Sequence, residues 1–196
     1  AWLRAQCFDI WGNTVPEGVV VTFSILDGPG GGEYLGTQDA AQTATGVTNS
    51  QGIASTVLHS GTVSGTVRTR AHIAGVLSNA TQVLISAGPP YKIVVGAEYC
   101  NIDWWDNVGE FAEVVAVVSD IYNNPVNDST VVYFTTDEGS IKSHENRTKE
   151  QNGVAYTKWI SGTHGGDDDG RIWIWAETAG GTVVDSTMFF NTHTTD

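Results

Sequence analysis

Hydrophobic and polar residues alternate along much of the chain with a period of two. The alternation is clearest at 53–59 (IASTVLH), 66–72 (TVRTRAH) and 171–177 (RIWIWAE). This period places successive side chains on opposite faces of a β-strand. No segment sustains the helical period of about 3.6 residues. The pattern therefore predicts an all-β protein in which one face of each strand lies in a core.

Turn-forming sequences separate the expected strands. WGN at 11–13, NSQG at 49–52, YNNP at 122–125 and EQNG at 150–153 are rich in Asn, Gly and Pro, which favour tight turns. Short strands joined by frequent turns are typical of an antiparallel β-sandwich. The composition agrees, because charged residues make up only 16% of the chain and polarity comes mainly from Thr, Ser, Asn and Gln.

The chain contains two copies of one sequence pattern. Residues 3–23 match residues 114–134, so that Asp9 aligns with Asp120. Two further matches follow in the same order: 52–62 with 153–163, and 66–75 with 171–180. The lengths of the copies differ only in glycine-rich loops, which indicates a duplicated structural module.

We predict that the copies form two tandem domains, at 1–88 and 89–196. The connecting sequence SAGPPYK at 86–92 contains two adjacent prolines that stiffen the join. The second copy carries an extra stretch, YKIVVGAEYC at 91–100, before its matching block, and the first copy has no equivalent. We therefore expect the first domain to lack its first strand and the second to be complete. Either the chain is a fragment of a longer tandem array, or another chain supplies the strand.

Each copy of the pattern opens with D-x-x-x-N-x-V, continues with a V-x-F strand, and ends with a glycine turn, S-G-T and an alternating strand. This pattern resembles the bacterial immunoglobulin-like domains of invasin- and intimin-type surface proteins, twice and over nearly the whole chain. The resemblance implies two tandem immunoglobulin-like antiparallel β-sandwiches. It also implies an extracellular stalk, spacer or adhesion role at a cell, virion or filament surface.

Within the pattern, Asp9 and Asp120 each end a strand and begin a turn. The Asn that follows each of them, Asn13 or Asn124, can hydrogen-bond the backbone of its own turn. We interpret this motif as a structural corner that occurs once in each domain, and not as a catalytic or metal-binding loop.

The net charge of −13 limits the expected partners. An acidic chain repels phosphate backbones, which disfavours nucleic-acid binding, and attracts divalent cations or basic surfaces. No apolar run approaches the ~20 residues that cross a bilayer, so no membrane span is predicted in this segment. The absence of an initiator Met and of a signal peptide predicts a mature or excised part of a longer protein.

The outward positions of the two copies differ in chemistry. Arg68 and Arg70 occupy outward positions of an alternating strand in the first copy, and Trp173 and Trp175 replace them in the second. We predict an outward aromatic patch in the second domain, formed by Tyr133, Trp173, Trp175 and Phe189. The patch is either a partner surface or is covered by the insertion NIDWWDNVGE at 101–110.

The sequence also predicts the surroundings of one tryptophan and of both cysteines. Trp159 aligns with Leu58 at an inward position, which places it in the core. Cys7 alternates with outward neighbours, which makes it a buried small hydrophobe. Cys100 is expected to be free or to pair between chains, because a bond to Cys7 would have to cross a domain.

Two acidic clusters are candidate calcium sites, since calcium is held by several carboxylate oxygens. They are Asp167, Asp168 and Asp169 in GGDDDG, and Asp103 and Asp106 in DWWDN. The alternative for the first cluster is a solvated acidic tip. The alternative for the second is a sugar site, whose stacking residues would be Trp104, Trp105, Trp173 and Trp175. No other cofactor is expected.

The sequence contains no G-x-S-x-G, H-E-x-x-H or phosphate-loop motif, and its histidines are scattered. We therefore predict a non-enzymatic extracellular structural or adhesion module, a stalk segment of a bacterial surface protein. The expected partner is a protein, either a second copy or a receptor, or else a glycan. One alternative is an assembly unit of a filament, phage tail or decoration protein with strand donation between subunits. The other is a carbohydrate-binding module that uses exposed Trp residues.

Overall fold

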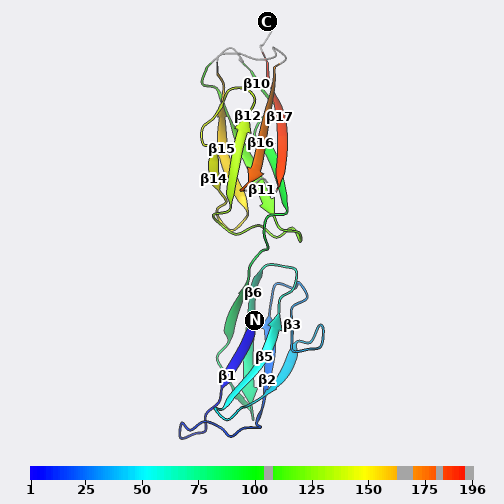
Figure 1. The fold of residues 1–196 in the computed structure, drawn as a ribbon, viewed down its shortest axis with the longest axis vertical. Helices are drawn as coiled ribbons and strands as arrows, with labels where there is room; N and C mark the ends of the chain where they lie inside the picture. The colour runs from blue at the N-terminus through cyan, green and yellow to red at the C-terminus, as the bar shows by residue number, and fades with distance from the viewer. Residues whose placement is uncertain (104–107, 163–169, 180–182, 193–196) are drawn as a thin grey trace. The chain divides into compact units, whose positions relative to one another are not determined.

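The computed structural model describes residues 1–103, 108–162, 170–179 and 183–192 (Figure 1). Over these ranges the regular structure consists of 17 β-strands, without a helix. The chain divides into two compact units, Ala1–Ser86 (unit one) and Ala87–Asp196 (unit two). The prediction of an all-β fold is confirmed.

Unit one is a sandwich of two sheets. Its strands are β1 (Trp2–Gln6), β2 (Val20–Asp27), β3 (Tyr34–Leu35), β4 (Thr43–Val47), β5 (Ile53–His59), β6 (Gly65–Ile73), β7 (Val76–Leu77) and β8 (Thr81–Ile85). One sheet has the order β1-β5-β3 and the other β4-β2-β6-β7, with β8 also paired to β6. All pairs are antiparallel, and alternate residues such as Leu3, Phe23 and Val67 meet in one core.

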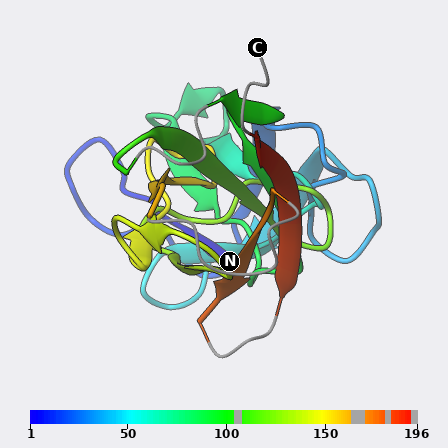
Figure 2. The ribbon, with the colours of Figure 1, turned by 90° about the horizontal axis from the view of Figure 1, so that it is seen from above.

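Unit two is also a sandwich of two sheets, and Figure 2 shows the chain from above. Its strands are β9 (Lys92–Ala97), β10 (Asn101–Asp103), β11 (Phe111–Ser119), β12 (Val131–Thr136), β13 (Ser140–Ile141), β14 (Glu145–Arg147), β15 (Val154–Ile160), β16 (Arg171–Thr178) and β17 (Val184–Thr192). The sheet orders are β13-β15-β11-β9 and β10-β17-β16-β12-β14. The pairing is antiparallel except between β10 and β17, which run parallel.

The strand registers show that the sequence repeat is a structural repeat. Ala5 pairs with Ala54 in unit one, and the aligned residues Ala116 and Ala155 pair in unit two. The second sheets match in the same way: Phe23 with Ala71, and Phe134 with Ala176. Aligned residues therefore occupy equivalent places in the two sandwiches.

The units differ beside their matching strands β1 and β11. In unit two, β11 lies between β15 and β9. In unit one, among the residues that the structure describes, β1 pairs with β5 alone. This difference leaves the outer edge of β1 open.

The predicted core position of Trp159 is confirmed, because its side chain is 1% exposed. Its indole Nε1 donates a hydrogen bond of 2.7 Å to the carbonyl of Glu138, which satisfies the one polar group of the ring. The ring also meets Phe189 edge-on, with 5.0 Å between ring centroids. Leu58, the aligned residue of unit one, is likewise buried.

The outward position predicted for Phe189 is wrong, because this side chain is 1% exposed and lies in the core. The cause is a difference in hairpin length. Leu84 pairs with Thr66 in unit one, but Arg171, which aligns with Thr66, pairs with Phe190. The last strand of unit two is therefore offset by one residue, and a shift of one residue exchanges the two faces of a strand.

Both cysteines are free thiols in the described structure. Cys7 is buried at an inward position of unit one, as predicted, and burial raises the pKa of its thiol. Cys100 is exposed just before β10 in unit two.

Candidate interaction surface

An aromatic stripe lies on the outer face of the sheet β10-β17-β16-β12-β14. It consists of Tyr133 on β12, Trp173 and Trp175 on β16, and Phe190 on β17, all of which are exposed large apolar side chains. Alternation along β16 produces this placement, since Ile172 and Ile174 point into the core. The outward positions predicted for Tyr133, Trp173 and Trp175 are confirmed, and Phe190 occupies the place expected for Phe189.

The two indole rings form the centre of the stripe. Their centroids lie 6.4 Å apart with an interplanar angle of 21°. Trp175 faces Thr135 on β12 and Ser186 on β17, and Trp173 faces Met188. Small or flexible cross-strand neighbours leave the rings 36–39% exposed. The result is a nearly parallel pair of rings with hydroxyl groups at its side.

Hydrogen bonds from the neighbouring turn fix the backbone beneath the first ring. The N–H of Trp173 donates to Asp137 Oδ1 at 2.8 Å, and the N–H of Asp137 donates to the carbonyl of Trp173 at 3.3 Å. This reciprocal pair orients Trp173, so that the ring is presented from a rigid strand.

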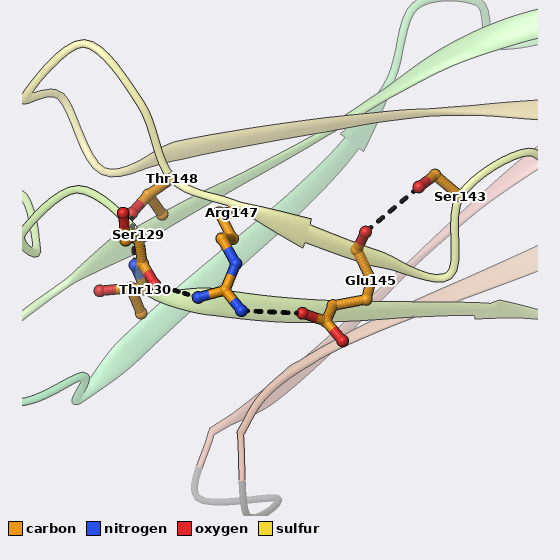
Figure 3. Close-up of polar contacts among 6 residues, drawn as sticks. All are labelled: Ser129, Thr130, Ser143, Glu145, Arg147 and Thr148. Carbon is orange, nitrogen blue, oxygen red and sulfur yellow. Dashed lines mark hydrogen bonds and ion pairs between the residues drawn. The ribbon is translucent and has the colours of Figure 1, made fainter.

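Charged residues surround the stripe. Glu177 lies opposite Tyr133 on one side, and Glu145 lies opposite it on the other. Arg147 pairs with Glu145 at 3.1 Å (Figure 3). Both side chains are about half exposed, so the pair contributes little to stability, but it keeps the edge of the stripe polar. An apolar centre with a polar rim is the arrangement found at protein interfaces.

Unit one lacks the stripe. Its aligned β6 residues, Arg68 and Arg70, place cations where unit two has the Trp pair. Arg68 forms an exposed ion pair of 3.0 Å with Asp27. The fold therefore tolerates either chemistry at these positions, and the aromatic residues are not required for the sandwich.

The remaining candidate residues lie partly outside the described structure. Those outside it are Trp104, Trp105, Asp106, Asp167, Asp168 and Asp169. The backbone of Asp103 is described, and it pairs with Thr192 between β10 and β17. Over the described ranges, no three His, Cys, Asp or Glu residues are grouped so that they could hold a metal ion. The same ranges contain no helix with the length and apolar character to cross a membrane.

The Asp corners belong to the frame of each unit. Asp120 accepts hydrogen bonds from the backbone N–H groups of Tyr122 and Asn124, and from Asn124 Nδ2, at 2.8–2.9 Å. Its Oδ2 also accepts the N–H of Gly88 at 2.9 Å. Asp9 accepts the equivalent bonds from its own turn. The structural interpretation of this motif is confirmed, although the Asp is the acceptor at its centre and the Asn is a donor.

A second corner, which the sequence pattern did not reveal, is built on Thr148. Its Oγ1 accepts the N–H of Thr130 at 3.1 Å and donates to the carbonyl of Asn127 at 2.8 Å (Figure 3 shows Thr148 beside Ser129 and Thr130). In unit one, Thr48 bonds Val19 and Pro16 in the same way. Only the repeat itself could have indicated this role, because a single Thr carries no motif.

Comparison with known proteins identifies the fold. The sequence matches no protein-family model and no curated protein. The structure is similar to FdeC, an Escherichia coli adhesin, with a TM-score of 0.58 at 17% sequence identity. The match covers 97% of this chain but 59% of the FdeC chain, so the chain spans less than two thirds of that protein.

Two further solved structures match with lower scores. The D0-D1 domain of intimin has a TM-score of 0.40 at 20% identity, with 96% of this chain and 89% of that chain covered. The Yersinia pseudotuberculosis adhesin InvE has a TM-score of 0.42 at 15% identity, with 97% and 53% covered. The likeness to FdeC carries the conclusion that the chain has the fold of bacterial immunoglobulin-like domains, as the sequence pattern implied.

Proposed function

We propose that this chain is a non-enzymatic stalk or adhesion module of a bacterial surface protein, located outside the cell. Its two immunoglobulin-like domains, at 1–88 and 89–196, hold the aromatic stripe away from the surface. The stripe is the contact site for a protein partner.

The aromatic stripe is the observation that carries the proposal. Trp and Tyr dominate the binding energy of protein interfaces, and contiguous exposed aromatic residues are costly unless they have a partner. Unit one has β2 and β6 in the places of β12 and β16 without these residues, so packing does not explain them. The fold shared with an adhesin supports the proposed location outside the cell.

The experiment compares the chain with a double variant, Trp173→Arg with Trp175→Arg. These substitutions introduce the residues that unit one carries at the aligned positions, so the sandwich is expected to remain intact. Trp11→Ala is the control, because Trp11 is 78% exposed on a turn of unit one. Beads coated with each protein are tested for attachment to a panel of cultured cells, and the mass of each protein in solution is measured by light scattering.

Attachment that the double variant loses and Trp11→Ala keeps would support the stripe as the adhesive site. A multimer that the double variant converts to a monomer would identify a second copy as the partner. Equal attachment and equal mass for all three proteins would contradict a role for the stripe.

A glycan is the second candidate ligand, favoured by the geometry of Trp173 and Trp175. Two nearly parallel exposed rings with Thr135 and Ser186 beside them offer apolar faces and hydroxyl partners to a sugar. Tryptophan fluorescence titrated against a glycan panel tests this candidate. A saturable change that Trp173→Arg abolishes would favour a glycan. An unchanged spectrum across the panel would leave a protein as the proposed partner.

A further inference from the structure

The charges of the chain are divided unequally between the two units. Unit one contains 5 acidic and 3 basic residues, a net charge of −2, whereas unit two contains 17 acidic and 6 basic residues, a net charge of −11. Two of the basic residues of unit one, Arg68 and Arg70, lie on the outer face of β6, where Val67, Thr69 and Ala71 point into the core. We call Arg68 and Arg70 the arginine pair. It is a cationic site on an acidic chain.

The arginine pair is only weakly engaged within its own unit. Arg68 Nη1 lies 3.0 Å from Asp27 Oδ2, and both side chains are about half exposed. This contact lies at the edge of the guanidinium group and leaves its flat face uncovered. Arg70 forms no ion pair with any residue that the structure describes, and its Nε is buried without a hydrogen-bond acceptor. A buried donor without an acceptor is unusual in a folded protein, so Arg70 lacks the partner that its group requires.

The aromatic stripe of unit two offers the chemistry that the arginine pair lacks. A guanidinium group is attracted to the face of an aromatic ring, and most strongly to that of tryptophan. Carboxylates lie beside the rings, since Glu177 and Glu145 stand on either side of Tyr133. Glu177 is exposed and Glu145 is half exposed. The stripe therefore presents rings on which an arginine can stack and carboxylates that can compensate its charge.

The spacing of the two surfaces also agrees. Trp173 and Trp175 are two residues apart on β16, and their ring centroids are separated by 6.4 Å. Arg68 and Arg70 are two residues apart on β6, which places their Cα atoms about 7 Å apart along the strand. Ser24, which lies opposite Arg70 on β2, is small and does not cover the guanidinium group. Both arginines can thus meet both rings when the two faces come together.

The ways in which two copies could join through the stripe differ in charge. A contact between two stripes would bring the acidic residues of both copies together, which is unfavourable. A contact between a stripe and an arginine pair brings opposite charges together. It joins two different surfaces, so each assembly keeps one free surface at either end and further copies can add to it.

We propose that the partner of the aromatic stripe is the arginine pair of a second copy of this chain. The guanidinium groups of Arg68 and Arg70 stack on the indole rings of Trp173 and Trp175. This proposal rests on the function proposed above, because it names the partner of the same site.

The test measures the mass of the full chain by sedimentation velocity at low salt, from about 10 µM to about 1 mM protein. The stripe variant is Trp173→Thr with Trp175→Thr, because threonine suits an outward strand position and adds no cation that could itself bind a stripe. The pair variant is Arg68→Gln with Arg70→Gln. Arg70→Gln and Arg4→Gln are matched single variants, since each removes one charge from unit one but Arg4 lies on β1, in the other sheet.

We expect the unmodified chain to form oligomers that grow with concentration, and each double variant to be a monomer. An equimolar mixture of the two double variants should form a dimer that grows no further, because each supplies the surface that the other lacks. Arg70→Gln should weaken association about ten-fold, the effect of losing one desolvated cation–π contact. Arg4→Gln should leave association unchanged.

Several outcomes would overturn the proposal. They are an unmodified chain that stays monomeric, a pair variant that still self-associates, a mixture that stays monomeric, and equal effects of Arg70→Gln and Arg4→Gln. Should the pair variant fail to fold, Arg68→Lys with Arg70→Lys keeps the charges but removes the flat groups, and undiminished association would contradict the stacking. An unmodified monomer that still attaches to cells through the stripe would overturn only the identity of the partner. An oligomer that attaches to cells equally with and without the stripe would support the arginine pair and contradict the adhesive role.

Discussion

Asp9 and Asp120 occupy the same corner of the two units but differ in exposure. Asp120 is 3% exposed and accepts an additional N–H from Gly88, whereas Asp9 is only half-buried. Asp120→Ala removes the acceptor of four hydrogen bonds, two of them from the buried Asn124, and we expect it to lower the free energy of unfolding of unit two by about 2–3 kcal/mol. Asp9→Ala should have a smaller effect on unit one. Urea denaturation of each variant measures both losses, and equal losses would contradict the role of burial.

The same carboxylate should make unit two sensitive to acid. Burial alone raises the pKa of Asp120, but the donors from Asn124, Gly88 and Tyr122 outweigh it and lower the net pKa. The ionised group therefore contributes stability above the ordinary pKa of about 3.9, and this contribution is lost as the pH falls through the lower folded pKa. Unfolding curves of unit two between pH 2 and pH 7 should show this loss. Asp120→Asn should flatten the dependence, and an unchanged slope would exclude Asp120 as its source.

The corner built on Thr148 gives a prediction that can be repeated on the equivalent corner of unit one, which is built on Thr48. Thr148→Val keeps the shape of the side chain but removes the hydrogen bonds of Oγ1 with the N–H of Thr130 and the carbonyl of Asn127, which still accepts from Thr130 Oγ1 at 2.7 Å. We expect a loss of about 1 kcal/mol in the stability of unit two, the typical net contribution of an intramolecular hydrogen bond. Thr148→Ser keeps the hydroxyl and should cost less. Thermal unfolding of these variants, and of Thr48→Val in unit one, tests whether the two corners are equivalent.

At the scale of the elements, the glycine that precedes β15 allows the backbone to pass close to the end of β11. Gly153 has φ of +69°, and a Cβ there would collide with the carbonyl oxygen of Val118. Gly109 also has positive φ, +100°, but has open space around it. Gly153→Ala should therefore destabilise unit two by more than about 1 kcal/mol, while Gly109→Ala carries only the backbone strain. Chemical denaturation compares them, and equal effects would contradict the steric argument.

The inward or outward direction of side chains along a single strand was predictable from the sequence, because it depends only on the alternation of residues within that strand. Trp173 and Trp175 follow from their own strand, and Trp159 follows from its alignment with Leu58. Phe189 was assigned to the wrong face because its direction depends on the length of the preceding hairpin. The alternation within the strand gives no information about that length. The Thr148 corner was missed because its partners, such as Asn127, are distant in sequence and carry no pattern.

At the scale of the whole molecule, each unit contains one cysteine, and the rate at which its thiol is labelled measures how accessible that part of the unit is. Cys100 is exposed, whereas Cys7 is buried and burial raises the pKa of its thiol, which lowers its thiolate fraction. A neutral thiol reagent should therefore label Cys100 rapidly and Cys7 only when unit one opens. Stopped-flow labelling should show two phases, and Cys100→Ser should leave the slow one. Two fast phases would mean that the core of unit one is already accessible.

The arrangement of β9 also has a mechanical consequence, which matters if unit two carries tension as the proposed stalk would. Within unit two, the chain enters at Lys92 and leaves along β17 at the opposite end of the sandwich (Figure 1). A pull on these two ends loads the β9–β11 hydrogen bonds along the strand axis, so they must break together. Unit two should therefore withstand a pull along β9 and β17 better than a pull that peels β9 sideways from the edge of its sheet.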